Sequence, residues 1–376
     1  MSTIEIKKVT SNKDLMNFIK MQWKIYENDP NWVPPLIMDR KKLLDKNKNP
    51  FYKHAEMELF LAYKDGQIAG RIAALTNENH NKFHEDNNGF FGFFESIDDV
   101  EVSKKLFETA EEWIKEKGKD GVLGPMNPSS NDELGVLVDG FDTPPYVLMC
   151  HNPKYYDKLI EDCGYKKAKD LWAWYIDSDT ANKNISEKMY RVAEMSTEKY
   201  GLSIRTINFK NMDEEVRRLR EVYNNAWSKN WGFVPMTDDE FNHLAADMKQ
   251  VADEDFVFIV EKDGTPVGFS LTLPNINEVL IKIKNGKLFP SGIFKLLFGM
   301  KRIQTVRVIT LGIIKEYQFA GFSSIMILKT IKTALEKGLK GGEMSWILED
   351  NHAMNSPIES LGAKKHKTYR IYQKQF

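Results

Sequence analysis

The sequence of 376 residues has little cysteine, almost no net charge and no long apolar run. Its two cysteines, Cys150 and Cys163, are too few for a zinc cluster or a disulfide framework, so we expect no metal and a reducing, cytoplasmic location. With 53 basic and 54 acidic residues, the net charge of −1 argues against a nucleic-acid partner. Apolar stretches such as 293–300 are far shorter than the ~20 residues that span a bilayer, and no apolar signal core occurs at the start. We therefore expect a soluble protein without stable membrane association.

An internal repeat organises the chain. An apolar run, Lys-Asp-Gly and a second apolar run occur at 59–70 and again at 257–268, a pattern typical of a β-hairpin. The motif Gly-x-Lys-Lys also occurs twice, at 164–167 and at 362–365. In both cases the second occurrence follows the first by 198 residues. Ordered repeats on this scale predict two copies of one domain.

The two predicted copies, 1–177 and 178–376, share one order of elements. Each has an opening helix, a hairpin, a strand, a long amphipathic helix, a short strand, a second helix and a closing strand. We predict the closing strands at 165–176 and 363–373. Hairpins combined with a strand–helix–strand crossover predict an α/β class with a mixed, α+β-like sheet.

The turn after the predicted strand 305–314 has the clearest chemical meaning. Its small residues, which include Gly321 and Ser323, let an anion approach the first backbone amides of the following helix. These amides have no partner within the helix and the helix dipole adds positive potential, so such a turn favours phosphate. The equivalent turn of the first copy contains Asp98 and Glu101, whose carboxylates would repel a pyrophosphate. We therefore expect a competent anion site only in the second copy.

This turn resembles the acetyl-CoA signature of the GNAT N-acyltransferases. In that signature Gln or Arg is followed by Gly three residues later and by Gly or Ala five residues later. Gln318 and Gly321 match, and Ser323 is a conservative departure. Asn351 and Gly362 have the spacing of the family's next landmark. The element order of both copies also matches. The chain is thus similar to a tandem GNAT protein, an organisation also found in N-myristoyltransferases and FemX-type aminoacyltransferases.

The resemblance implies acetyl-CoA, or another acyl-CoA, as co-substrate and no metal. In this family the strand before the turn splays from its neighbour and pairs with the pantetheine arm, and the amides of the turn hold the pyrophosphate. A backbone amide near Ile313 would stabilise the oxyanion formed during attack on the thioester. Carried over, the cofactor-binding residues are Leu311, Gly312, Ile313, Gln318, Phe319, Ala320, Gly321, Phe322, Ser323 and Asn351.

The acid and base residues of the family are matched less well. A Tyr that often follows the Asn by seven residues, and that protonates the leaving thiolate, is replaced here by Ile358. The predicted splayed strand also contains no Glu that would act as the base. The remaining catalytic candidates are Glu343, Glu349 and Tyr317, with solvated strand-end carboxylates as the alternative interpretation of the two Glu residues.

Two segments distinguish the copies. The first copy has a long polar loop, 125–153, and we expect an acceptor pocket at the interface of the copies, although a capped turn is an equal alternative. The residues expected in that pocket are Asn127, Ser129, Asn131, Glu133 and Trp231. The second copy has an inserted stretch, 282–302, that mixes Lys with Phe, Leu and Ile. We interpret it as a lid over the acyl-CoA or as extra packing, ahead of an interfacial membrane helix.

Together these features predict an N-acyltransferase that moves acetyl from acetyl-CoA to an amine of a small molecule or peptide. The first copy would be structural or would complete the acceptor site. Two alternatives stay open. A non-catalytic acyl-CoA-binding or scaffold protein is favoured by the missing Tyr, and a FemX-like aminoacyltransferase is disfavoured because a tRNA-borne donor calls for a basic surface.

Overall fold

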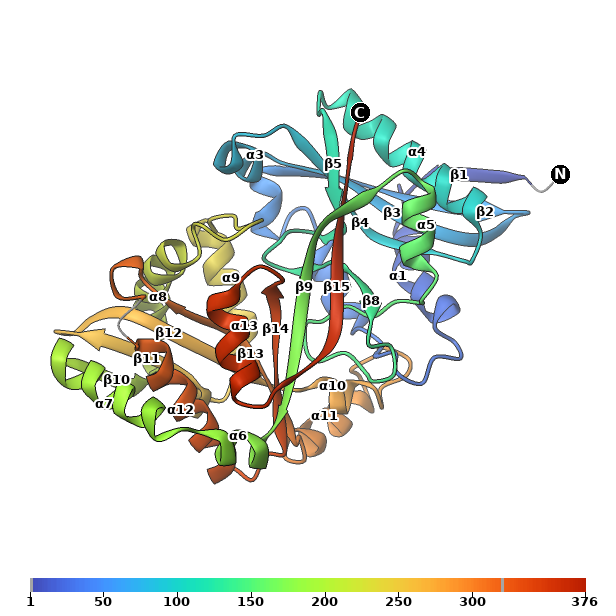
Figure 1. Ribbon diagram of the computed structural model, residues 1–376. Helices are drawn as coiled ribbons and strands as arrows, with labels where there is room; N and C mark the ends of the chain where they lie inside the picture. Colours follow the sequence, from blue (N-terminus) through green and yellow to red (C-terminus); the bar gives the residue numbers. More distant parts are fainter. Residues whose placement is uncertain (1–2, 319–320) are drawn as a thin grey trace. The chain divides into compact units, whose positions relative to one another are not determined.

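The computed structural model of the protein describes residues 3–318 and 321–376 (Figure 1). The chain divides into two compact units that exchange segments along the sequence. Unit 1 consists of Met1–Leu171, Val279–Phe298 and Lys367–Phe376. Unit 2 consists of Trp172–Glu278 and Gly299–His366.

The first half of the chain alternates short helices with strands. Its strands are β1 (Ile4–Lys8), β2 (Ala55–Lys64), β3 (Gln67–Asn77), β4 (Asn88–Ser96), β5 (Gly121–Gly124), β6 (Met126–Asn127), β7 (Glu133–Leu134), β8 (Val136–Asp139) and β9 (Lys166–Asp177). Its helices are α1 (Asn12–Ile25), α2 (Ile37–Leu43), the 3-10 turn η1 (Pro50–Lys53), α3 (Glu78–His84), α4 (Val100–Glu116) and α5 (Tyr156–Asp162).

The second half repeats this alternation. Its strands are β10 (Leu202–Thr206), β11 (Val257–Lys262), β12 (Thr265–Pro274), β13 (Thr305–Ile313), β14 (Gly341–Leu348) and β15 (Lys364–Gln375). Its α-helices are α6 (Ser178–Asn184), α7 (Glu187–Tyr200), α8 (Met212–Ala226), α9 (Asp238–Lys249), α10 (Asn277–Leu280), α11 (Gly292–Met300), α12 (Phe322–Glu336) and α13 (His352–Ser360). Short 3-10 turns are η2 (Phe209–Asn211), η3 (Glu254–Phe256) and η4 (Lys315–Tyr317).

Unit 1 is built on a mixed sheet with the strand order β1-β2-β3-β4-β5-β15. The β2–β3 hairpin turns at Asp65 and Gly66, which both have positive φ, as its sequence predicts. Strands β4 and β5 are parallel because α4 carries the chain from one to the next. Unit 2 has the corresponding order β10-β11-β12-β13-β14-β9, and α12 makes the same crossover between the parallel strands β13 and β14. The predicted α/β class with a mixed sheet is confirmed.

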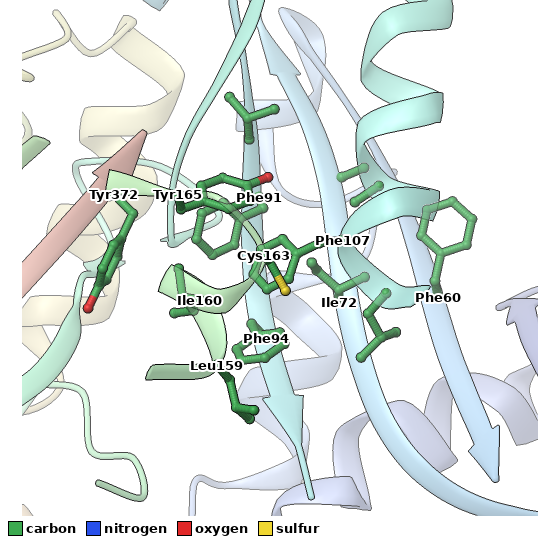
Figure 2. Packing of buried hydrophobic residues seen from close by; sticks show 14 of the residues in the cluster. Phe60, Ile72, Phe91, Phe94, Phe107, Leu159, Ile160, Cys163, Tyr165 and Tyr372 are labelled. Carbon is green, nitrogen blue, oxygen red and sulfur yellow. The ribbon is translucent and has the colours of Figure 1, made fainter. Parts of the chain in front are cut away.

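Aromatic rings fill the core of unit 1, where α4 and α5 cover the sheet. The ring of Phe107 on α4 lies 5.0 Å from that of Phe91 on β4, and Tyr165 lies 5.3 Å from Phe91. Figure 2 shows these rings beside Phe94 and Tyr372. Tyr372 comes from the last strand of the chain and is fully buried, so the C-terminal residues are part of the first unit's core.

The closing strands differ from a simple repeat because each one belongs to both units. β9 begins in unit 1, and its residues from Trp172 onward belong to unit 2. β15 does the reverse, since its residues from Lys367 onward belong to unit 1 and pair with β5, with Tyr372 opposite Gly124. The segment Val279–Phe298 likewise belongs to unit 1. Among residues 3–318 and 321–376, no helix is both long and apolar enough to cross a bilayer.

Candidate functional site

Strands β13 and β14 of unit 2 pair for only part of their length. Thr305–Val308 lies opposite Gly341–Met344, and among the described residues no pairing between the two strands continues beyond this register. β13 nevertheless runs on to Ile313 and β14 to Leu348. Trp346 has a φ of 32°, which is unusual for a bulky residue, so β14 changes course where it leaves its neighbour. The carboxyl ends of the two strands therefore diverge, as the resemblance implies.

A cavity of about 180 Å³ lies in unit 2 along this divergence. Its walls come from both strands and from α12 and α13, and they are mainly apolar. Representative lining residues are Ile309, Thr310, Leu311, Ile331, Trp346 and Ile358. Trp227 and Asn230, which follow α8, complete the wall. Such walls suit an alkyl group better than a charged one.

The open edge of β13 presents backbone amides to this region. The amide of Ile314 donates to the carbonyl of Val267, at 2.9 Å, on the side of β12. Since successive peptide groups of a strand point to opposite edges, the amide of Ile313 points to the edge that β14 has left. The amide of Leu311 shares that orientation. These donors are available to a ligand that lies between the strands.

The equivalent amide of unit 1 is occupied by the protein itself. Ser96 ends β4 as Ile313 ends β13, because Ser96 lies opposite Gly70 and Ile313 lies opposite Gly268, the same glycine of the repeated hairpin. The amide of Ser96 donates to the hydroxyl of Tyr156 at 3.0 Å. The side chain of Tyr156 thus binds in unit 1 the amide whose counterpart in unit 2 points to the open edge.

Asn127, which was predicted to bind an acceptor, has a contact within unit 1. Its Oδ1 accepts from the amide of Phe93 at 2.6 Å.

Buried polar atoms around the divergence also lack partners. Within the described residues, Thr310 Oγ1, Trp346 Nε1 and Glu343 Oε1 are buried without a hydrogen bond. Buried polar atoms are normally paired, because an unpaired one costs about 1–3 kcal/mol. Thr310 and Trp346 line the cavity. A bound molecule with polar groups would give them partners.

The start of α12 differs from the start of α4 as the sequence predicts. Gly321 is the N-cap residue of α12 with a φ of 79°, and in the described part of this turn there is neither a side-chain cap nor an acidic residue in the first turn. In α4, Asp99 accepts from the amides of Glu101 and Val102 and also binds Lys64. Burial raises the pKa of Asp99, but the bonds from Lys64 and the amides outweigh it and hold that pKa below its ordinary value. The first backbone amides of α4 are therefore already bound to a carboxylate of the protein.

The remaining turn residues have structural contacts. Gln318 donates from Nε2 to the carbonyl of Ile313 at 3.3 Å, which ties the turn to the end of β13. Phe322 is fully buried, so only its backbone is available to a ligand. A Cβ on Gly321 would lie 2.4 Å from Val192 of α7, so α7 packs closely on this residue. Ser323 is half-buried in the first turn of α12. Phe319 and Ala320 lie outside the described residues.

Three other predicted ligand residues lie along the divergence. Leu311 and Asn351 line the cavity, and the side chain of Asn351 also caps α13 by accepting from the amide of Met354 at 3.2 Å. Gly312 faces the ring of Trp227, because a Cβ at Gly312 would lie 1.9 Å from a ring carbon. The structure thus brings Leu311 and Asn351 together at one cavity, and Gly312 packs on Trp227, another residue of its wall.

The predicted catalytic residues lie outside the cavity lining. Glu343 is fully buried on β14, and its Oε2 lies 2.8 Å from Nε2 of His366. Tyr317 accepts from Lys262 at 3.2 Å, and this bond raises the pKa of Lys262. Glu349 is half-buried just after β14.

Sequence reasoning missed two neighbours of the site, His366 and Arg307. The sequence gave no signal for His366, because its partner Glu343 lies on a different strand. Arg307 is 1% exposed, donates to Oγ of Ser345 at 2.7 Å and lies 4.9 Å from the ring centre of Trp346. Its place in an otherwise apolar strand pattern was the available signal. Within residues 3–318 and 321–376, no group of three or more His, Cys, Asp or Glu is arranged to hold a metal ion.

The loop residues predicted to bind an acceptor have partners in unit 1. Glu133 forms an ion pair with Arg40 at 2.6 Å, and Ser129 donates to Asp132 at 2.6 Å. These contacts support the capped-turn interpretation of the loop. All five predicted acceptor residues lie outside the lining of the unit 2 cavity, namely Asn127, Ser129, Asn131, Glu133 and Trp231.

A strand order repeated in two units, with a helix crossover between strands that diverge in the second, defines a tandem GNAT fold. A solved structure described as a tandem GNAT protein from the clavulanic acid biosynthesis pathway aligns with a TM-score of 0.59 at 11% identity. The alignment covers 99% of this chain and 98% of that chain. The resemblance to a tandem GNAT protein is confirmed.

Two curated proteins are similar in sequence over nearly their whole length. Protein YghO of Escherichia coli K12 is 38% identical over 371 residues, which cover 97% of this chain and 94% of that protein. The bacterial ceramide synthase of Caulobacter vibrioides NA1000/CB15N is 37% identical over 373 residues, with coverage of 97% and 96%. The chain belongs to the family of these two proteins. No protein-family profile matches it.

The contact between Trp227 and Gly312 generates a stability prediction. Gly312→Ala places a methyl group against the Trp227 ring, so we expect the free energy of unfolding to fall by about 1–3 kcal/mol. In a Trp227→Ala background the same change should cost much less. A double-mutant cycle by urea denaturation measures this coupling. Additive costs would contradict the assignment of this glycine to ring packing.

Proposed function

We propose that the protein is an N-acyltransferase that takes an acyl group from an acyl-CoA and transfers it to an amine. The observation that carries this proposal is the apolar cavity along the divergence of β13 and β14. The free edge of β13 suits the amide groups of a pantetheine arm. The start of α12, without carboxylates, suits a diphosphate. The acyl chain, the pantetheine arm and the diphosphate of an acyl-CoA therefore each have matching chemistry in unit 2.

The cavity favours an acyl chain longer than acetyl. A closed apolar cavity of about 150 Å³ holds a benzene ring. The cavity of about 180 Å³ in unit 2 would leave most of its apolar wall uncovered around an acetyl group. The C. vibrioides relative is named a ceramide synthase, and a ceramide is the amide of a fatty acid and a long-chain amino alcohol. We therefore propose a long-chain acyl donor and a long-chain amino alcohol as acceptor.

The chemistry needs a proton acceptor and an oxyanion donor. The amine nitrogen attacks the thioester carbonyl, the C–N bond forms, the C–S bond breaks, and the proton lost by nitrogen ends on the CoA thiol. The amide of Ile313 is placed to stabilise the oxyanion. Glu343 and His366 form the base candidate with the best geometry, because a buried carboxylate orients an imidazole at 2.8 Å. Ile358 is 4% exposed in an apolar cluster, so the thiolate must receive its proton from another group or from water.

The decisive experiment measures thiol release from acyl-CoA donors, from acetyl to palmitoyl, with a panel of amines that includes a long-chain amino alcohol. We expect turnover to rise with chain length. Thr330 lines the cavity from α12, so Thr330→Phe should shift the preference toward shorter donors. Lys329→Phe, at the exposed neighbouring position, is the matched control and should keep the wild-type profile.

Each outcome of this assay has a clear meaning. A strong preference for acetyl with small amines or peptides would favour the narrower acetyltransferase that the sequence suggests. Tight acyl-CoA binding without thiol release for any amine would contradict the proposal and favour a binding or scaffold protein.

The anion site generates a prediction in which stability and binding respond differently. Ser323→Asp puts a carboxylate at the start of α12, where the helix dipole makes it stabilising by about 0.3–1 kcal/mol. The same charge repels a diphosphate, so we expect at least about tenfold weaker CoA binding by calorimetry. Ser323→Asn is the neutral control and should bind normally. Gly321 is unsuitable for this test, since any side chain there meets Val192. Undiminished affinity of the Asp variant would place the diphosphate elsewhere.

The base assignment generates a kinetic prediction. Glu343→Gln keeps the size of the side chain but removes its charge beside His366. We expect kcat to fall severalfold at neutral pH, while acyl-CoA affinity stays the same because Glu343 does not line the cavity. An unchanged kcat would remove Glu343 from the proton pathway.

A further inference from the structure

The α11 surface of unit 1 exposes an unusual group of apolar side chains. We define this surface as Phe289, Phe294, Leu297 and Phe298 together with Lys282, Lys284, Lys287 and Lys295. The four apolar side chains are 60–71% exposed. Among the described residues, the other strongly exposed large apolar side chains are scattered along the chain, whereas these four fall within ten consecutive positions. Scattered exposed residues need no explanation, but a cluster marks an interaction site.

The segment that carries this surface is fixed to the body of unit 1. The carbonyl of Lys284 accepts from Nε1 of Trp23 at 2.7 Å, and the carbonyl of Gly286 accepts from the amide of Ile37 at 2.9 Å. Ile283 is 2% exposed, and a Cβ on Gly286 would lie 2.5 Å from the Trp23 ring. The base of the segment is thus packed on α1 and α2, so the exposed rings belong to a segment that is held by contacts with the rest of unit 1.

Helical geometry gathers the apolar side chains on one side. Phe294, Leu297 and Phe298 are spaced by three and four residues on α11 (orange in Figure 1), so they share one face. Lys295 lies next to this face, and its Nζ donates to the carbonyl of Lys282 at 2.9 Å. The tip of the segment therefore presents adjacent rings with ammonium groups around them.

The charge of the segment has one sign. All four lysines of the surface are exposed, and the sequence from 279 to 304 contains no Asp or Glu. Exposed helices elsewhere in the protein mix charges; α7, for example, has Glu187, Glu194 and Glu198 beside its exposed Met195. A partner of the α11 surface must accept aromatic rings and supply negative charge.

We propose that the α11 surface docks on an anionic lipid bilayer. The rings enter the boundary between headgroups and acyl chains, while the lysines remain at the level of the lipid phosphates. A second copy of the chain fits less well, because a two-fold contact would bring lysines against lysines. The insertion then serves as an interfacial anchor, the interpretation that the sequence ranked behind a lid or extra packing. The proposal does not depend on the acyltransferase activity.

The test is vesicle co-sedimentation of the full-length protein without acyl-CoA. The vesicles contain phosphatidylcholine alone or phosphatidylcholine mixed with phosphatidylglycerol. We expect wild type to bind the anionic vesicles, and high salt to weaken this binding. The triple variant Phe294→Ser, Leu297→Ser, Phe298→Ser should lose at least about tenfold in partitioning. The variant Lys282→Gln, Lys284→Gln, Lys287→Gln keeps the rings and should lose the preference for anionic vesicles.

Met195→Ser on α7 is the matched control, since Met195 is 64% exposed but lies among carboxylates, and it should bind as wild type does. Thermal unfolding verifies that each variant is folded. Failure of wild type to bind either vesicle would overturn the proposal, and so would equal binding by the triple serine variant. Self-association in ultracentrifugation that the triple variant abolishes, without vesicle binding, would assign the surface to a second copy instead.

Discussion

The end of pairing between β13 and β14 is the constraint on which unit 2 depends. A sheet normally satisfies every backbone amide and carbonyl through its neighbours, and a divergence inside the sheet leaves two edges open. The protein supports this opening with Arg307 at the last paired positions. Its guanidinium binds Ser345 and lies against Trp346, the residue whose positive φ redirects β14. Burying this cation is costly unless it is compensated, so its presence here indicates that the course of β14 after the divergence matters.

Comparison of the two units shows how one fold gives one open and one closed site. In unit 2 the amide of Ile313 points to the open edge, and the first turn of α12 contains no carboxylate. In unit 1 the amide of Ser96, which corresponds to that of Ile313, donates to the hydroxyl of Tyr156, and the first amides of α4 donate to the carboxylate of Asp99. The core of unit 1 is also packed with aromatic rings from β4, α4 and α5. The first unit thus satisfies with its own side chains the amides whose counterparts in the second unit are open.

The sequence predicted what depends on local chemistry. The Asp-Gly hairpins, the order of helices and strands, and the bare start of α12 follow from turn residues, periodicity and helix capping, and all are present. The edge strands β1 and β10 were missed, because they are short and half polar and are defined by their partners. The division of β9 and β15 between units was missed for the same reason, since strand pairing across some 200 residues leaves no local pattern. Asn127 was a plausible ligand residue from its polarity alone, and only the position of Phe93 shows what it binds.

The apolar cavity and the α11 surface make compatible demands on a substrate. A cavity with alkyl-lined walls selects molecules that are poorly soluble in water, and such molecules concentrate in membranes. An enzyme in solution would meet them at very low free concentration, whereas one held reversibly at the bilayer meets them at a high local concentration. Exposed rings have an energetic cost for a protein that stays in water, and that cost is recovered only where the rings enter an apolar phase. Under the two proposals, the exposed Phe residues of unit 1 and the apolar wall of the unit 2 cavity are two consequences of one requirement, namely access to a substrate with a long hydrocarbon chain.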